Sequence, residues 1–297
     1  MIKNKDSLKA KVKNLALKNN IDSSYILQTF MFEALLKRIE KSNYKDNFII
    51  KGGFLLSSLF GVDNRTTLDL DTTLKGISLT KENIEKIIDE IINIDVDDNI
   101  EFSIFSIKDI RLEEKYSGFC VHLNANFEGL KKHLLIDITT GDVITYREIN
   151  FSYKTIFDDE IINIMAYNIE TIVAEKFEAI LSKNIENTRM KDYYDLYIFT
   201  SLKWDKIDKE ILKKAILNTC NNRESNEYLN DSDYYIDMIC KNEFIKKLWN
   251  DYKNKYSYAK NISFEDTIKA IEKINDVVKE SAWKYAHFSC VFYIYLL

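Results

Sequence analysis

Proline is absent from this 297-residue chain, and its seven glycines all lie in the first half. The last glycine is Gly141, so 297 − 141 = 156 residues follow without either of the two residues that most often interrupt helices and form tight turns. Collagen-like, proline-rich and glycine-linker architectures are therefore excluded. A β-sandwich or barrel over the whole chain is disfavoured, because such folds rely on Gly and Pro in their turns. We expect the second half to be helical.

The composition is that of a globular protein of one large or two medium domains. Basic residues number 42 and acidic residues 47, which gives a net charge of −5 and little indication of nucleic-acid binding. The four cysteines form no CxxC pair and there are only three histidines, so neither a disulfide framework nor a zinc finger is expected. The N-terminus is polar and basic and lacks a secretory apolar core. We therefore expect a cytoplasmic protein with reduced thiols.

The most apolar stretch of the chain is residues 288–297. Its length is about half of the ~20 residues that a membrane span needs. We interpret it as a packed terminal element, with a short membrane-touching tail as the less favoured alternative. No membrane partner is expected.

Helical and alternating apolar patterns are mixed in the first half, whereas helical periods dominate the second. Asp6 or Ser7 can cap the first helix, and Asp22 marks the start of the next. The predicted helices are residues 6–42, 54–60, 81–92, 169–181 and 191–200, with several more between 209 and 280. The predicted strands are residues 48–50, 66–73, 101–108, 118–126 and 133–139, with further extended segments in 143–165.

Two aspartates separated by one residue, Asp69 and Asp71, are the sharpest chemical feature. They fall in a predicted strand, so both carboxylates point to the same face. Carboxylates this close repel one another unless a cation lies between them, and Mg²⁺ prefers one or two carboxylates plus substrate phosphates. Two acids on a solvent-facing edge strand are the plain alternative, and for this pair alone that alternative is favoured.

Gly52 and Gly53 change that balance, because they follow an apolar strand and open a short helix. The missing Cβ atoms let the backbone approach a phosphate, and the helix N-terminus offers free N–H groups and a positive dipole. An ordinary strand-to-helix turn is the alternative. Two glycines that open a helix, followed after that helix by Asp-Leu-Asp on a strand, are more specific than either motif alone.

A third acid, Asp137, lies in an apolar predicted strand. A carboxylate there needs a partner if it is buried. A metal shared with Asp69 and Asp71 would provide that partner, whereas the alternative is that Asp137 ends its strand and faces solvent. We favour the metal role, so the predicted metal ligands are Asp69, Asp71 and Asp137.

The order of these motifs resembles the nucleotidyltransferase superfamily, and their details resemble the AbiEii/AbiGii toxin family. Residues 47–71 resemble the first motif of that family, matched by Lys51, Gly52, Gly53, Arg65, Thr67, Asp69 and Asp71. Residues 133–142 resemble the second motif, with Asp137 matching its acid. The third and fourth motifs are matched by Ala174, Glu175 and Lys176, and by Arg189, Lys191, Asp192, Asp195 and Leu196. Residues after about 200 carry no motif of this family.

The resemblance implies a bilobed α+β protein. Residues 1–165 would form a nucleotidyltransferase-like mixed sheet flanked by helices, and residues 166–297 a helical lobe that contributes Lys176 and Asp192 to the site. It also implies a toxin of a toxin–antitoxin or phage-defence pair that arrests growth, with a cognate antitoxin encoded nearby. Some relatives transfer nucleotides to the acceptor end of tRNA, which makes tRNA a candidate acceptor.

Residue roles carried over from the family go further than the residues alone support. Lys176 can extend a charge to triphosphate oxygens, although a surface lysine paired with Glu175 is the plain alternative. Asp192 could serve only to start its helix, and Asp195 only as a partner for a nearby cation; of the two, Asp192 is our first choice for a functional role. The resemblance assigns nucleotide binding to Gly52, Gly53, Arg65, Thr67, Lys176, Arg189 and Lys191.

Phe54 departs from the small or hydroxylic residue that is frequent after the glycines. Phosphate contact at this turn is therefore expected from backbone N–H groups rather than from a side chain.

Together these residues predict a Mg²⁺-dependent nucleotidyltransferase with an NTP as substrate. Its catalytic residues would be Asp69, Asp71, Asp137, Lys176 and Asp192, and catalysis would come mainly from positioning and electrostatics. Two other functions remain open at this stage. One is a nucleotide-binding or partner-binding module without catalysis, and the other is an enzyme that transfers nucleotidyl or phosphoryl groups to protein hydroxyls.

Overall fold

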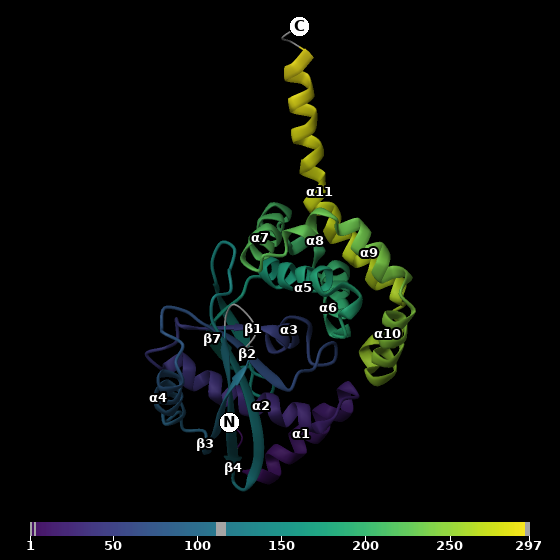
Figure 1. Ribbon diagram of the computed structural model, residues 1–297. Coiled ribbons are helices and arrows are strands. Elements are labelled where there is room, and N and C mark those ends of the chain that lie inside the picture. The colour runs from purple at the N-terminus through teal and green to yellow at the C-terminus, as the bar shows by residue number, and fades with distance from the viewer. Residues whose placement is uncertain (1, 3, 111–116, 295–297) are drawn as a thin grey trace. The chain divides into compact units, whose positions relative to one another are not determined.

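The computed structural model describes residue 2 and residues 4–110 and 117–294, with side chains described as far as Lys279. The chain divides into two compact units (Figure 1): Met1–Asp142 with Glu148–Tyr167, and Val143–Arg147 with Asn168–Leu297. N-terminal helices and a mixed sheet precede a run of helices, which confirms the predicted α+β class. Within the described part of the chain, no helix has both the length and the apolarity to cross a membrane. The predicted packing of residues 288–297 lies outside the described side chains.

The first unit contains four helices and seven strands among its described residues. In chain order they are α1 (Lys5–Asn19), α2 (Ser23–Lys41), β1 (Phe48–Lys51), α3 (Gly52–Phe60), β2 (Asp69–Leu74), α4 (Lys81–Ile92), β3 (Ile100–Ile110), β4 (Gly118–Phe127), β5 (Leu130–Thr139), β6 (Ile149–Lys154) and β7 (Ile161–Ala166).

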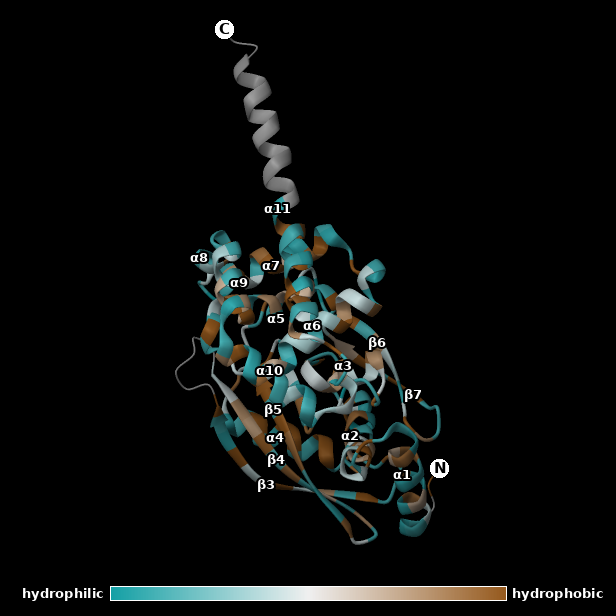
Figure 2. Ribbon diagram, turned by 90° about the vertical axis from the view of Figure 1, so that its right-hand side faces the viewer, coloured by the Kyte–Doolittle hydropathy of each residue, from teal (hydrophilic) through white to brown (hydrophobic). Residues whose placement is uncertain are grey.

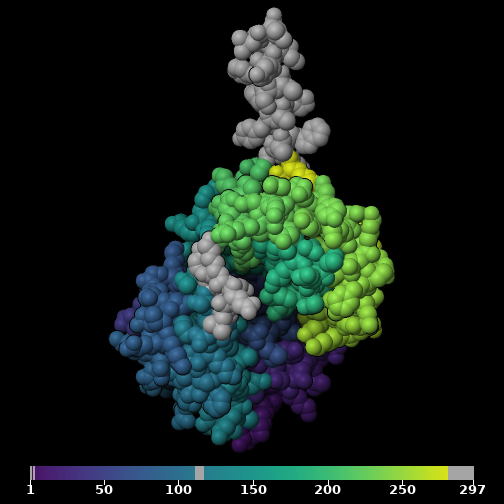
Figure 3. All heavy atoms as spheres, viewed as in Figure 1, coloured from purple at the N-terminus to yellow at the C-terminus, as the bar shows by residue number. Residues whose placement is uncertain are grey.

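One sheet of mixed direction joins all seven strands in the order β3-β4-β5-β2-β1-β7-β6. β2 runs parallel to β5 and β1 parallel to β7, whereas the other neighbours are antiparallel. β3, β4 and β5 are the long strands of Figure 2. In Figure 3 the part of the chain that contains them, coloured blue to teal, lies at the surface. β1 is buried along its whole length, as expected for a central strand covered on both faces.

Helices α2 and α4 pack on the sheet and on each other. In α4 the predicted bounds are confirmed, and its buried residues are the isoleucines of one helical stripe: Ile84, Ile87, Ile88, Ile91 and Ile92. The predicted cap of α1 is wrong, because the side chain of Asn4, not Asp6 or Ser7, accepts the Ser7 N–H. Asp22 caps α2 as predicted, by accepting the Ser24 N–H.

Two predicted bounds next to the glycine turn differ from the structure. Helix α3 begins at Gly52 rather than at residue 54, so both glycines belong to its first turn. Strand β2 begins at Asp69 rather than at residue 66. The Thr67 hydroxyl lies within hydrogen-bonding distance of the Asp69 carbonyl and N–H groups, and this local side-chain contact replaces strand pairing.

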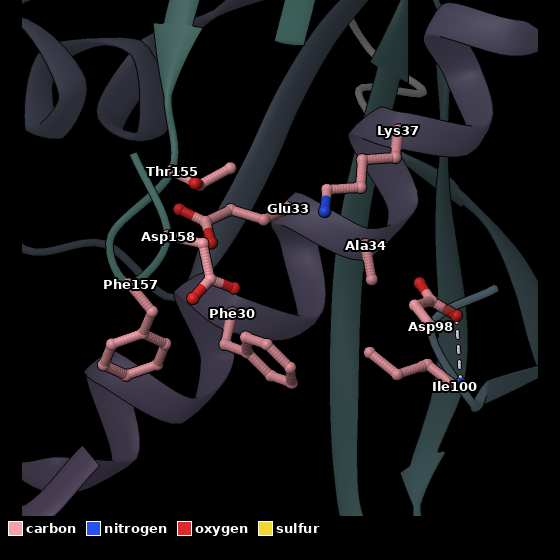
Figure 4. A pocket seen from close by; sticks show the side chains of 9 residues that line it. All are labelled: Phe30, Glu33, Ala34, Lys37, Asp98, Ile100, Thr155, Phe157 and Asp158. Atoms are coloured by element: carbon pink, nitrogen blue, oxygen red, sulfur yellow. Dashed lines mark hydrogen bonds between the residues drawn. The ribbon is translucent and has the colours of Figure 1, made fainter. Parts of the chain in front are cut away.

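A buried carboxyl group on α2 was not foreseen from the sequence. Glu33 is 4% exposed, and its Oε1 accepts hydrogen bonds from the Tyr153 hydroxyl and the Ile156 N–H, both at 2.8 Å. It lines a small pocket, where Figure 4 shows it beside Thr155 and Asp158. Burial raises the pKa of Glu33 to about 8, although the two hydrogen bonds and the charge of Lys37 act to lower it. The carboxyl group is therefore protonated in the folded protein at neutral pH.

The second unit is helical, as the scarcity of Gly and Pro predicted. Its helices are α5 (Ile169–Lys183), α6 (Met190–Leu202), α7 (Lys209–Asn222), α8 (Asn226–Asn230), α9 (Ser232–Lys241), α10 (Glu243–Lys255) and α11 (Phe264–Ile294). Helix α5 is central, because it packs against both α6 and α7, and α6 packs in turn on α11. Phe177 of α5, Phe199 of α6 and Trp249 of α10 are fully buried in this unit.

We expect Glu33→Gln to change how the stability of the protein depends on pH. Between pH 4.5 and 8 the unfolded chain carries an ionised Glu33 while the folded chain carries a protonated one, so wild-type stability falls as the pH rises. At about 1.4 kcal/mol per pKa unit, this amounts to several kcal/mol across the range, and the neutral amide of Gln removes it. Urea unfolding of both proteins at pH 5, 6.5 and 8 measures the difference.

The matched control is Glu85→Gln on the exposed face of α4. It should follow the wild-type pH profile. A stability difference between wild type and Glu33→Gln that stays constant from pH 5 to 8 would contradict the prediction.

Candidate active site

One row of laterally paired residues crosses the sheet of the first unit. Lys51 at the end of β1 pairs with Asp71 on β2. Asp71 pairs in turn with Asp137 on β5, and Asp137 pairs with Cys120 on β4. Laterally paired residues point to the same side of a sheet, so these four side chains share one face. Asp137 lies within β5, so the alternative in which it ends its strand is wrong.

Asp69 belongs to the same face, one pair further along β2. It lies beside Leu135 of β5, and it is half-buried, as are Asp71 and Asp137. Leu70 and Thr72 alternate with the two aspartates and are fully buried, which confirms the predicted alternation. Three carboxylates therefore gather on one face of two adjacent parallel strands.

Cys120 is a neighbour of this cluster that sequence reasoning missed. Its pKa is raised to about 12 by burial, by a hydrogen bond to the Asp137 carboxylate, and by the negative charges of Asp137 and Asp69. The thiol therefore stays protonated and can donate to Asp137. No local signal in the sequence pairs positions 120 and 137, because their pairing depends on the β4–β5 register.

The glycine turn brings the backbone against Asp71. Gly52 has φ +62°, and a Cβ atom built on it would lie 1.9 Å from Asp71 Oδ2. The next N–H group, that of Gly53, donates to the same oxygen at 3.4 Å. The glycines were predicted to let the backbone approach a phosphate, whereas in the structure Gly52 makes room for the Asp71 carboxylate at the start of α3. Phe54 turns away from the site, since it is 3% exposed and stacks on Tyr153.

Arg65 and Thr67 also lie at the start of α3. A Cβ atom on Gly53 would be 2.6 Å from the Thr67 hydroxyl oxygen and 3.6 Å from Arg65 Nη2. Arg65 is 4% exposed and donates to the Thr66 carbonyl at 2.5 Å. The structure therefore brings together five of the residues predicted for phosphate and metal binding: Gly52, Gly53, Arg65, Thr67 and Asp71.

A second missed feature is a buried ion pair next to this turn. Lys51 Nζ lies 2.5 Å from Asp142 Oδ2, and both side chains are less than a tenth exposed. The sequence signals were the Lys before the two glycines and the Gly-Asp that ends the second motif. Neither signal shows that the two residues meet.

The second unit holds the other predicted cluster, which centres on Lys176 of α5. Its Nζ lies 2.8 Å from Asp192 Oδ1 and 2.6 Å from Asp195 Oδ2, both on α6. Asp192 and Asp195 are 3% and 0% exposed. Burial acts to raise the pKa of Asp192, but the charges of Lys176, Arg189 and Lys191 hold it below its usual value. The carboxylate is therefore ionised at neutral pH.

Other charged residues of the third and fourth motifs have separate partners. Glu175 pairs with Arg223, the residue that follows α7, at 3.2 Å. The Lys176 side chain is only 12% exposed, so the alternative of a surface lysine is wrong. Arg189 is half-exposed, and its Nε lies 3.4 Å from Asp192 Oδ2. Asp192 does lie in the first turn of α6, but its carboxylate also forms ion pairs with the side chains of Lys176 and Arg189. A helix-start role alone does not explain that arrangement.

The donor chemistry of the first cluster suits a hard divalent cation. Asp69, Asp71 and Asp137 supply carboxylate oxygens, which Mg²⁺ prefers, and substrate phosphates commonly complete such a site. Across the described residues, however, no three His, Cys, Asp or Glu side chains converge on one metal position. The three carboxylates therefore match Mg²⁺ in donor chemistry and in their shared face, but the described residues form no preassembled metal site.

Comparison with known proteins agrees with these motifs. Residues 34–271, well over half of the chain, match the sequence profile of the family described as nucleotidyl transferase AbiEii toxin, type IV TA system. Comparison with curated proteins found no significant match. The fold is similar to the crystal structure of JHP933 from Helicobacter pylori, with a TM-score of 0.49, 13% identity and coverage of 90% of this chain and 99% of that one.

A crystal structure of a candidate nucleotidyltransferase from H. pylori is also similar, with a TM-score of 0.48, 13% identity and coverage of 88% of this chain and 98% of that one. The profile match spans all the motifs that contain the two clusters. The chain therefore belongs to the AbiEii nucleotidyl transferase toxin family of type IV toxin–antitoxin systems.

Proposed function

We propose that this toxin transfers a nucleotidyl group from an NTP to an acceptor hydroxyl, with Mg²⁺ bound by Asp69, Asp71 and Asp137. The observation that carries the proposal is the register of β2 with β5, which sets Asp71 beside Asp137 with Asp69 on the same face. The start of α3 lies against Asp71. The N–H groups that would bind phosphate are therefore next to the carboxylates that would bind Mg²⁺.

The proposed roles of the site residues in the first unit follow from their positions. The N–H groups of Gly52 and Gly53 would hold the β- and γ-phosphates, because the first N–H groups of a helix have no intrahelical partner. The Gly53 N–H would exchange its long 3.4 Å contact with Asp71 Oδ2 for a phosphate oxygen. Arg65 and Thr67, at the same helix start, would add a cation and a hydroxyl donor. Bound Mg²⁺ ions would neutralise the triphosphate and stabilise the attacking and leaving oxygens.

The transfer itself exchanges a phosphoanhydride bond of the NTP for a phosphoester bond to the acceptor. The acceptor oxygen would attack the α-phosphorus of the NTP while the bond from that phosphorus to the oxygen bridging to the β-phosphate breaks, and pyrophosphate leaves. Asp137 would accept the proton of the attacking hydroxyl.

We further propose a domain division near residue 165, with the helical domain supplying Lys176 and Asp192 to the reaction. Lys176 would neutralise charge on the triphosphate, and Asp192 would hold the lysine in place, as the 2.8 Å contact supports. Arg189 and Lys191 would bind the nucleotide. The acceptor end of tRNA is our first candidate for the acceptor, a cognate antitoxin is the proposed partner, and an NTP-consuming toxin of this family would act in the cytoplasm.

The test is a labelling assay with purified protein, Mg²⁺, total RNA and cell-lysate protein, run with α- and γ-labelled NTPs in parallel. Nucleotidyl transfer to RNA puts the α-label, but not the γ-label, into RNA. Label in protein would indicate a protein acceptor, and γ-label in the product would indicate phosphoryl transfer. Binding of NTP without any labelled product would overturn the enzymatic assignment.

We predict that Asp69→Asn lowers the rate of transfer by a factor of at least about 10², because a proposed metal ligand and its charge are lost. The thermal unfolding temperature should change little, since Asp69 is half-buried on an open face. Asp109→Asn, an exposed carboxylate on β3 of the same sheet, is the matched control and should keep wild-type activity. Full activity of Asp69→Asn would end the assignment of this residue.

Gly52→Ala should reduce transfer by more than tenfold, because the new Cβ atom cannot coexist with Asp71 Oδ2 in its present position. Gly129 also has a positive φ, +83°, but nothing lies within 4 Å of its would-be Cβ atom. Both alanine variants should lose about 1–2 kcal/mol of stability for the left-handed backbone, and Gly52→Ala should lose more because of the clash with Asp71. Only Gly52→Ala should lose activity. Equal activities of the two variants would show that the close approach to Asp71 is dispensable.

Lys176→Met should both abolish transfer and destabilise the helical unit. Removing the ammonium leaves Asp192 and Asp195 buried without their main cation, and breaking a buried pair costs about 3–5 kcal/mol. Lys183→Met, at an exposed position of the same helix, should do neither. Urea unfolding and the transfer assay, run well below the unfolding midpoint, separate the two effects. Wild-type activity in a folded Lys176→Met protein would exclude the lysine from the reaction.

A further inference from the structure

A buried polar network adjoins the carboxylate row, on the side away from Asp69. The Asp142 carboxylate oxygen Oδ2 accepts three hydrogen bonds: from Lys51 Nζ at 2.5 Å, from the Thr73 hydroxyl at 3.0 Å and from the Thr139 hydroxyl at 3.1 Å. Lys51 Nζ also donates to the Thr139 hydroxyl at 2.9 Å. All four residues are buried or nearly so.

The network reaches one strand further through Tyr167, which follows β7. The Tyr167 hydroxyl lies 2.8 Å from that of Thr73, and its ring lies 5.5 Å from Lys51 Nζ. The Tyr167 N–H donates to the Ile50 carbonyl of β1 at 3.0 Å. One connected set of polar groups therefore ties together β7, β1, β2 and β5, four adjacent strands of the sheet.

The position of this network relative to the proposed site follows from the register. Lys51 is the lateral partner of Asp71 and directly precedes Gly52. Thr73 and Thr139 are partners of each other, one same-face pair beyond Asp71 and Asp137. Lys51, Thr73 and Thr139 are thus either paired with a proposed metal ligand or two residues from one along a strand. Asp142 and Tyr167 lie just beyond the ends of β5 and β7.

We propose that the Lys51–Asp142 ion pair is a positioning element of the active site, which holds Asp71 and Asp137 in line with the glycine turn. The proposal rests on the proposed nucleotidyl transfer. Both side chains are less than a tenth exposed, and their charges face each other and the threonine hydroxyls. They would therefore act through the carboxylates rather than on substrate. Because low-dielectric surroundings strengthen such a satisfied pair, it resists small shifts between β1, β2 and β5.

The test uses three variants and one control pair. Lys51→Met and Asp142→Asn each remove one charge with little change of shape, and the double variant Lys51→Met/Asp142→Leu removes both. Replacing both partners of a buried pair often preserves folding, whereas removing one leaves an uncompensated charge. The control is Lys75→Met with Glu148→Gln, an ion pair at 2.7 Å in the same unit whose lysine is 56% exposed.

Three measurements are made on each protein: kcat and KM for the NTP, the Mg²⁺ concentration for half-maximal rate, and hydrogen exchange of peptides covering residues 52–56 and 69–73. In each single variant we expect kcat to fall more than tenfold, the Mg²⁺ requirement to rise several-fold and KM for the NTP to change less than threefold. The double variant should lose no more activity than the worse single one, because both residues act as a unit. Exchange should quicken at both peptides, and the control pair should match wild type.

Wild-type kcat and Mg²⁺ dependence in folded Asp142→Asn and in the folded double variant would overturn the proposal. So would a rise in KM without a fall in kcat for Lys51→Met alone, since that pattern marks direct contact with substrate. If the wild-type protein itself transfers nothing, the proposed function fails instead. In that case unchanged exchange in the variants would refute the positioning role as well, whereas faster exchange confined to the two peptides would support it.

Discussion

The pairing of β2 with β5 is the constraint on which the proposed site depends. A strand places alternate side chains on opposite faces, so a slip of one residue would carry Asp69 and Asp71 to the buried side, where Leu70 and Thr72 now lie. The apolar face therefore specifies the register, and the register brings Asp71 beside Asp137. Three like charges on one face carry an electrostatic cost that a divalent cation would relieve. The same pairing thus stabilises the sheet and fixes the arrangement of the carboxylates in the proposed site.

Glycine has a more specific use here than conformational freedom. Gly52 is required because Asp71 occupies the space of a side chain, and Gly53 because Thr67 does. Without these two Cβ atoms, a carboxylate and a hydroxyl can approach the start of α3, and the Arg65 guanidinium lies in ordinary contact beside them. Lys51, one residue earlier, forms a buried ion pair with Asp142, which restrains the backbone at the start of the turn.

Local patterns in the sequence predicted most of the fold, because the isoleucine stripe of α4 and the alternation around Asp69 record burial directly. They did not predict which strands are neighbours, and so the contacts of Cys120 with Asp137 and of Lys51 with Asp142 went unseen. Glu33 was missed for a related reason: its partner Tyr153 is 120 residues away in the chain. For Lys176 the family motif indicated a functional role, but only the structure shows that its ammonium group contacts both Asp192 and Asp195.

The proposed site is tested most directly by a crystal structure of the protein with Mg²⁺ and a non-hydrolysable NTP analogue. We expect at least one ion bound to carboxylate oxygens of Asp69, Asp71 and Asp137, with the β- and γ-phosphates on the N–H groups of Gly52 and Gly53. An ion and triphosphate bound elsewhere on the protein, with these carboxylates outside the coordination, would contradict the proposed site.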